Sequence, residues 1–209
     1  MALTQVIGKG LGTLGDGTAN DVKIVFDGNA QDFHIGLDDS ADSLTIGLGS
    51  ALGTTSHMVI DANGHVTKPL QSAFSVTKSA QNNFAVGSEV TLVYNSERFD
   101  QNSDFASNTF TAPVTGRYLF GCRARVDNLD KDASYYYLQL TTSNENYYNI
   151  ITFSSQSSNQ VYYHFDLNQL ADMDAGDTAT MAIVQSDQTV ETDLSGDGGS
   201  QGFWGFLVA

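Results

Sequence analysis

VKIVFD at residues 22–27 is followed by three related segments: FHIGLD at 33–38, LTIGLG at 44–49 and SHMVID at 56–61. The segments follow one another at steps of 11, 11 and 12 residues. In each of them, apolar side chains occupy alternate positions, which is the period of a β-strand with one apolar face. Turn-forming Gly, Asp, Asn and Ser residues stand between the segments. The stretch therefore predicts a repetitive array of short β-strands.

Strands of this length carry only two or three apolar side chains each, too few for a core of their own. The rest of the chain can cover this apolar stripe, or equivalent stripes of other copies can meet it at a symmetry axis. We favour association and expect residues 20–69 to form a homotrimeric β shaft. His34 and His57 alternate with the apolar positions, so we expect them at the surface. The predicted core of the trimeric shaft consists of Ile24, Phe26, Ile35, Leu37, Ile46 and Leu48.

Segments of some viral tail fibres and tailspikes resemble this stretch. The similar segments are DGNA at 27–30, IGLDDS at 35–40 and MVIDANG at 58–64. Residues 1–19 hold five glycines among scattered apolar residues and no helical pattern. We expect them to act as an N-terminal docking arm, which in a fibre would attach to other virion proteins.

Residues 70–209 predict a second unit, built from about eight strands spaced as in a β-sandwich. Pro113 and Gly116 mark a tight connection in this region. Aromatic residues alternate along several segments, as expected for two antiparallel sheets packed face to face. The predicted strands lie at residues 73–76, 90–95, 110–120, 135–142, 147–153, 160–167, 178–185 and 202–208.

An ordered series of motifs in this region resembles the globular domain of the first complement component, subunit q. That family shares its jelly roll with tumour necrosis factor. The motifs are AFS at 73–75, Asn95, FTAPVTGRYLF at 110–120, Gly176-Asp177 and FWGFL at 203–207. The stretch before Gly176 is longer than the family pattern has it. The resemblance covers about 135 residues and implies a jelly-roll head.

The resemblance also implies that the head is a compact trimer with aromatic residues along its three-fold axis. The expected trimer core of the head consists of Phe74, Tyr118, Phe120, Phe203 and Phe206. Relatives carry this head behind a collagen stalk, whereas this chain has no G-X-Y repeat. The 11-residue repeats take that position here, which favours a virion over a secreted animal protein.

The chain carries 24 acidic and 9 basic residues, for a formal net charge of −15. Such a charge disfavours nucleic acid as a partner and offers no phosphate-binding cluster. No apolar run is long enough to insert into a membrane as a helix, and no signal peptide is evident. Cys122, the single cysteine, lies in an apolar run and is expected to pack as a small hydrophobe. We expect synthesis in a host cytoplasm.

A search for catalytic and cofactor motifs finds none, so we predict that the chain is not an enzyme and needs no cofactor. Acidic groups at 127–132 and 172–177 leave a Ca²⁺ site open, although neither has EF-hand spacing. Adjacent tyrosines on a strand point to opposite faces, so one of each pair should face outward and offer a platform for carbohydrate. The predicted ligand-binding residues are Tyr135, Tyr136, Tyr147, Tyr148 and Tyr162. The alternative is that outward tyrosines are shared between subunits or simply half exposed.

The sequence thus predicts an all-β virion fibre or spike protein. Its trimeric head would recognise a host surface glycan or protein for host attachment. Two alternatives remain: a decoration or linker protein that binds no receptor, and a cellular lectin-like adhesion module.

Overall fold

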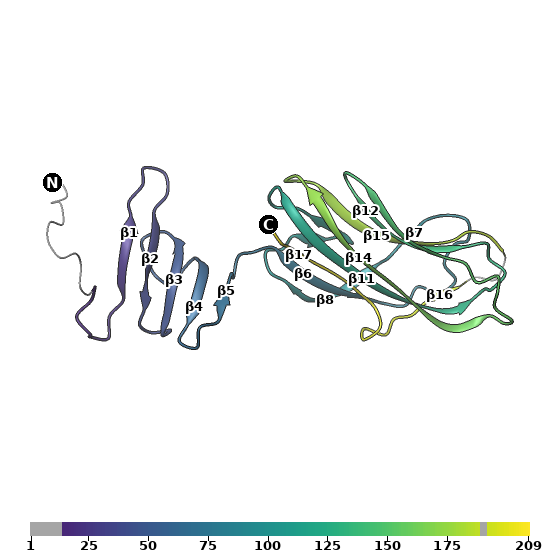
Figure 1. The fold of residues 1–209 in the computed structure, drawn as a ribbon, viewed down its shortest axis with the longest axis horizontal. Helices are drawn as coiled ribbons and strands as arrows, with labels where there is room; N and C mark the ends of the chain where they lie inside the picture. Colours follow the sequence, from purple (N-terminus) through teal and green to yellow (C-terminus); the bar gives the residue numbers. More distant parts are fainter. Residues whose placement is uncertain (1–13, 189–191) are drawn as a thin grey trace. The chain divides into compact units, whose positions relative to one another are not determined.

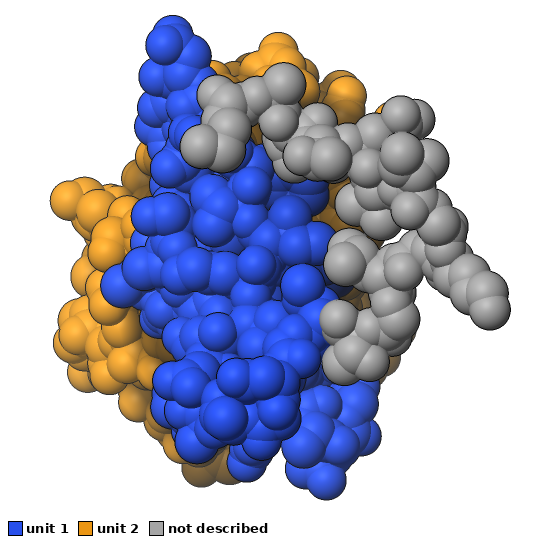
Figure 2. Space-filling view, turned by 90° about the vertical axis from the view of Figure 1, so that its left-hand side faces the viewer, with its two compact units in different colours: residues 1–70 blue, residues 71–209 orange. Residues whose placement is uncertain are grey.

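The computed structural model describes residues 14–188 and 192–209, and no helix occurs among them. The chain divides into two compact units, residues 1–70 and residues 71–209 (Figures 1 and 2). The prediction of an all-β chain with a sandwich is confirmed. Most of the predicted docking arm, residues 1–13, lies outside the described residues.

Unit 1 is a single sheet of five strands that follow one another in chain order. Every neighbouring pair is antiparallel, as expected for strands joined by short turns. The strands are β1 (Val22–Phe26), β2 (Phe33–Asp38), β3 (Ser43–Leu48), β4 (Ser56–Asp61) and β5 (Val66–Thr67).

The register of these pairs places most apolar positions of the five strands on one face of the sheet, whereas Val25 and Val59 lie on the other. Residues directly opposite each other in an antiparallel pair point to the same side. Three rows result and form a surface that we call the apolar sheet face. Its rows are Phe26, Phe33 and Leu48; Ile24, Ile35, Ile46 and Met58; and Val22, Leu37, Leu44, Ile60 and Val66.

The opposite, polar face of the sheet is covered by the chain itself, and this overturns one expectation. His34 was expected at the surface, but it is fully buried, and Thr45 is also buried. The loop at residues 49–55 folds back over this face: the Gly49 carbonyl oxygen lies 2.8 Å from Nδ1 of His34, and a Cβ at Gly53 would lie 2.9 Å from Oδ2 of Asp38. The loop is closed by the Leu48 amide, which donates to the Thr55 carbonyl at 2.9 Å. A local loop thus shields the polar side chains, while the apolar face stays open.

Unit 2 is a sandwich of two mainly antiparallel sheets between which the chain crosses repeatedly, as in a jelly roll. One sheet has the order β14-β11-β17-β6-β8, with β16 paired to β11, and we call it the arginine sheet. The other has the order β13-β12-β15-β10-β9, with β7 paired to β15, and we call it the tyrosine sheet. The strands of the arginine sheet are β6 (Ala73–Lys78), β8 (Tyr94–Asp100), β11 (Gly116–Leu129), β14 (Gln160–Met173), β16 (Asp193–Leu194) and β17 (Gly202–Leu207). Those of the tyrosine sheet are β7 (Val90–Thr91), β9 (Phe105–Ala106), β10 (Thr109–Thr111), β12 (Tyr136–Thr142), β13 (Asn146–Ile151) and β15 (Thr178–Gln185).

The core of unit 2 lies between these sheets and is rich in aromatic rings. The ring of Phe74 has its centroid 5.0 Å from those of Phe105, Phe110 and Phe203. This corrects the placement of four residues that were expected along a trimer axis. Their side chains are buried within a single chain, so they offer no surface to another copy. These residues are Phe74, Tyr118, Phe120 and Phe203.

Candidate functional site

The apolar sheet face of unit 1 is the largest unshielded apolar feature of that unit. Phe26 is 60% exposed, Ile24 46% and Phe33 43%. Leu37, Leu44, Ile46 and Val66 are exposed as well. A contiguous exposed apolar surface of this kind marks an interaction site in a stable protein. All six residues predicted for the shaft core belong to this face. They are Ile24, Phe26, Ile35, Leu37, Ile46 and Leu48.

The tyrosine sheet carries an aromatic cluster on its outer side. Tyr135 and Tyr137 stack with centroids 6.0 Å apart, and Tyr148 stands perpendicular to Tyr137 at 5.3 Å. Together with Ile150 they line an open hollow of about 320 Å³, which we call the tyrosine hollow. Tyr148 is 49% exposed. The structure thus brings together two predicted ligand-binding residues, Tyr135 and Tyr148, and adds Tyr137 and Ile150, which the sequence analysis missed.

The other predicted tyrosines do not join this hollow. Tyr136 points into the core, where its hydroxyl accepts from the Asp130 amide at 2.9 Å and lies 3.1 Å from the Thr192 hydroxyl. Tyr147 is half buried and packs against the same core. Tyr162 is exposed but belongs to the arginine sheet, where the Arg125 guanidinium lies 4.9 Å from its ring centroid. Tyr136 and Tyr147 are therefore removed from the candidate ligand-binding set, because their side chains face the core. Their sequence neighbours Tyr135, Tyr137 and Tyr148 line the tyrosine hollow instead.

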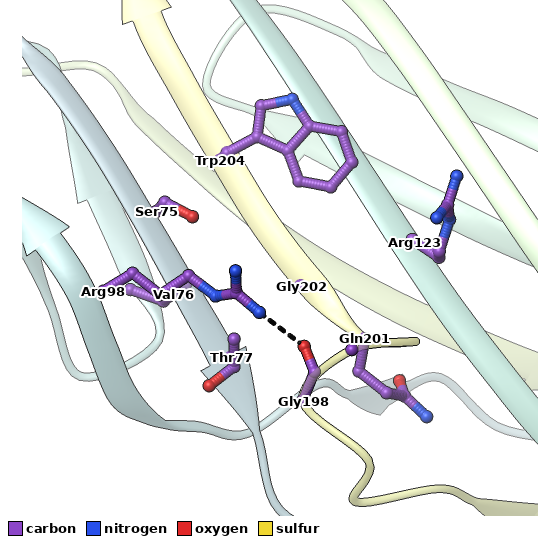
Figure 3. A pocket seen from close by; sticks show the side chains of 10 residues that line it. Ser75, Val76, Thr77, Arg98, Arg123, Gly198, Gln201, Gly202 and Trp204 are labelled. Carbon is purple, nitrogen blue, oxygen red and sulfur yellow. Dashed lines mark hydrogen bonds between the residues drawn. The ribbon is translucent and has the colours of Figure 1, made fainter.

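A second hollow, of about 200 Å³, opens on the outer side of the arginine sheet (Figure 3). We call it the arginine–tryptophan hollow. Trp204 on β17 lies at one end, and its indole ring is seen face-on in Figure 3. Arg98 on β8 reaches in from the side and donates from Nη2 to the Gly198 carbonyl at 2.8 Å. The remaining lining residues are Ser75, Val76, Thr77, Arg123, Gly199, Gln201 and Gly202.

The chain has four arginines, and all of them lie on this one sheet. Three of them pair with aspartates: Arg117 with Asp172 at 3.8 Å, Arg123 with Asp166 at 2.7 Å and Arg125 with Asp127 at 2.9 Å. The hydrogen bond and charge of Asp166 raise the pKa of Arg123. Arg98 differs, because its described partner is a backbone carbonyl. The arginine sheet therefore holds every arginine of the chain, with the charge of three of them offset by neighbouring aspartates.

Phe206, the remaining residue of the predicted trimer core, lies two positions beyond Trp204 on β17. It is 41% exposed and stands opposite Leu119, which in turn stands opposite Leu170. The three side chains form a short apolar row on the outer side of the arginine sheet. This row is one exposed apolar surface of unit 2 through which another copy could be contacted.

Two buried groups have strongly shifted pKa values, yet neither forms a catalytic arrangement. Burial raises the pKa of Cys122 to about 12, so its thiol stays protonated at neutral pH. Burial lowers the pKa of Lys78 to about 8, and its Nζ donates to the Ser79 carbonyl at 2.6 Å. Cys122 lies within the sandwich core, with the Tyr94 hydroxyl 3.6 Å from its Sγ.

The carboxylates of the acidic groups at 127–132 and 172–177 have partners within the protein, and Asp127 and Asp172 pair with Arg125 and Arg117. Asp130 accepts from the Asp132 amide at 3.0 Å, and Asp177 accepts from the Asp174 amide at 2.8 Å. Within residues 14–188 and 192–209, no group of three or more His, Cys, Asp or Glu side chains could hold a metal ion. The same residues include no helix that could cross a membrane.

Comparison with known proteins gives similarity to solved structures alone. No family model and no curated protein matches the chain. The globular domain of the zebrafish complement 1qA protein is similar at 20% identity, with 66% of this chain and 98% of that chain covered and a TM-score of 0.48. Murine APRIL at pH 8.0 is similar at 10% identity, with 66% and 99% covered and a TM-score of 0.49. The jelly-roll assignment rests on the strand order of residues 71–209 itself.

Proposed function

We propose that the chain is a non-enzymatic, homotrimeric fibre-type protein of a virion. In this proposal, unit 1 forms the shaft by association of its apolar sheet face. Unit 2 forms a head that binds a host surface glycan or protein, and residues 1–19 dock to other virion proteins. The virion assignment is supported by the resemblance of the 11-residue repeats to viral fibre segments.

The proposal rests on the difference in solvent exposure between the two faces of the unit 1 sheet. The polar face, with His34 and Thr45, is buried beneath a loop, whereas the apolar face is open. An isolated sheet gains stability by burying its apolar side chains, at about 1.5–3 kcal/mol for each large one. Identical faces of three copies, turned toward a common axis, would supply that burial and shield one another from water.

We infer the trimeric state from the resemblance of the sequence motifs of unit 2 to those of trimeric jelly-roll heads, and the exposed row of Phe206, Leu119 and Leu170 supports it. Three heads on one shaft would present three copies of each binding surface together. Several weak contacts made at once give an avidity that one head lacks. An attachment protein benefits directly from this arrangement.

We propose the tyrosine hollow as the ligand-binding surface of the head, because the predicted residues Tyr135 and Tyr148 line it. Its exposed rings offer flat apolar faces next to hydroxyl groups, which suits a sugar ring as well as a protein side chain. Gln139 stands opposite Tyr148 but is almost fully buried, so the exposed rings provide the contact surface.

Binding of the full chain to a glycan array and to host cells tests the attachment role. We expect binding that Tyr148→Ser weakens, while Val161→Ser, which changes an exposed residue on the other sheet, serves as the control and retains it. A trimer that binds neither glycans nor cells would favour the decoration or linker alternative. Binding to surfaces of the organism that makes the protein would favour the cellular adhesion alternative.

A further inference from the structure

A glycine gives Trp204 a flat seat on the arginine sheet. Gly121 on β11 stands directly opposite Trp204 on β17, and a Cβ at position 121 would overlap the indole ring. Because Gly121 carries no side chain, the indole can lie across β11 and turn its outer face toward the hollow. Figure 3 shows this face.

The charge of the arginine–tryptophan hollow is the reverse of that of the chain. No carboxylate belongs to its lining, although the chain has 24 acidic residues. Arg123 is neutralised by Asp166, whereas Arg98 makes no ion pair with the residues that the structure describes. The hydrogen bond to the Gly198 carbonyl fixes the Arg98 guanidinium at the hollow and leaves its other N–H groups available. An arginine held in this way matches the geometry of a carboxylate.

Polar groups complete the lining. Ser75 and Thr77 bring hydroxyl groups from β6. Gln201 is almost fully buried, and its Nε2 donates to the Arg125 carbonyl at 2.7 Å. Its amide therefore supports the floor of the hollow from below, and the groups open to a ligand are the hydroxyls and the Arg98 guanidinium.

We propose that this hollow is a binding site for a carboxylate-bearing saccharide. The sugar ring stacks on the indole of Trp204, its carboxylate pairs with the Arg98 guanidinium, and its hydroxyl groups exchange hydrogen bonds with Ser75 and Thr77. The site is separate from the tyrosine hollow, which lies on the other sheet, and from the apolar sheet face of unit 1. The proposal deepens the binding role of the head and rests on it, but not on the oligomeric state.

Trp204 is the single tryptophan of the chain, so its fluorescence reports on this site directly. We would titrate the full chain with glucuronic acid and with N-acetylneuraminic acid. Glucose would serve as the neutral control and sodium sulfate as the control for a bare anion. We expect saturable changes in emission with at least one acidic sugar, and much weaker responses to glucose and sulfate.

The variant Arg98→Gln should weaken binding of the acidic sugar roughly tenfold or more, because it removes a charge-assisted hydrogen bond. Arg117→Gln, on the same sheet but outside the hollow, should leave binding unchanged. Trp204 emission that responds to neither acidic sugar would overturn the proposal. This holds even if the reason is that another copy of the chain covers the hollow in the assembly. An equal response to sulfate or glucose, or unchanged binding by Arg98→Gln, would overturn it too. Light scattering on the same samples gives the mass independently, so that failure of this site and failure of the trimer are distinguished.

Discussion

The imidazole Nδ1 of His34 lies 2.8 Å from the carbonyl oxygen of Gly49. Since that oxygen can only accept, Nδ1 is the donor, and the bond ties strand β2 to the first residue of the loop that covers it. We predict that His34→Ala destabilises unit 1 by about 1–3 kcal/mol, the range for a lost bond that leaves a buried group unpaired. Hydrogen exchange should show reduced protection at residues 48–55. The exposed His164 provides the control His164→Ala, and equal protection in both variants would contradict this role.

Phe74 should be a main source of stability in unit 2. Its ring packs against Phe105, Phe110 and Phe203 inside the sandwich. Phe74→Ala is expected to cost about 3–5 kcal/mol of unfolding free energy, measured by chemical denaturation. Phe99→Ala, on the neighbouring strand but half exposed, should cost less than about 1 kcal/mol. Similar losses for the two variants would show that the core is not where the structure places it.

Lys78 should lower stability at neutral pH. Below pH 8 the ammonium is charged in both folded and unfolded chains, so folding has to bury a charge. Between about pH 8 and the ordinary value of 10.5, the folded state releases the proton while the unfolded state keeps it, and stability rises. We therefore expect Lys78→Met to be more stable than the parent chain by roughly 1–3 kcal/mol at pH 7. This gap should close as the pH approaches 10.5; a gap independent of pH would contradict the burial of a charged lysine.

The thiol of Cys122 should be inert in the folded protein. It is fully buried, and its pKa is raised to about 12 by that burial. A thiol reagent should therefore label it only as fast as the sandwich opens, and immediately in denaturant. Fast labelling under native conditions would mean that the sandwich does not enclose this side chain.

The sequence predicted the strands of unit 1 well, because an alternating apolar pattern defines both the strand and its apolar face. The burial of His34 could not be predicted in this way. It depends on a loop folding back over the sheet, and no local pattern encodes that contact. The same limit applies to Tyr137: its position beside Tyr148 follows from the pairing of β12 with β13, which the separate strands do not reveal.

In unit 2 the alternation rule predicts that one tyrosine of each adjacent pair faces outward, but it does not say which one. The structure turns Tyr135 and Tyr148 outward, and Tyr136 and Tyr147 toward the core. The rule also does not say which partner a buried aromatic residue meets. Phe74 and Phe203 were expected to contact other subunits, but the second sheet of the same chain covers them. The glycine seat of Trp204 likewise requires the register of β11 against β17.

A charge in the middle of the apolar sheet face should break the proposed association. Ile46 lies in the central row, between Ile35 and Met58. In an assembly, Ile46→Asp would lose about 2 kcal/mol of apolar burial in each copy and bury a carboxylate as well. We expect the variant to dissociate into folded monomers. Lys23→Asp, on the opposite face of β1, is the matched control and should stay associated.

The molar mass of the full chain in solution, measured by light scattering at micromolar concentration, tests the account most directly. The proposed homotrimer predicts three times the chain mass of 22.4 kDa, reduced to the single-chain value by Ile46→Asp. A stable, well-folded monomer of the parent chain would contradict the account, because the exposed face would then need no partner.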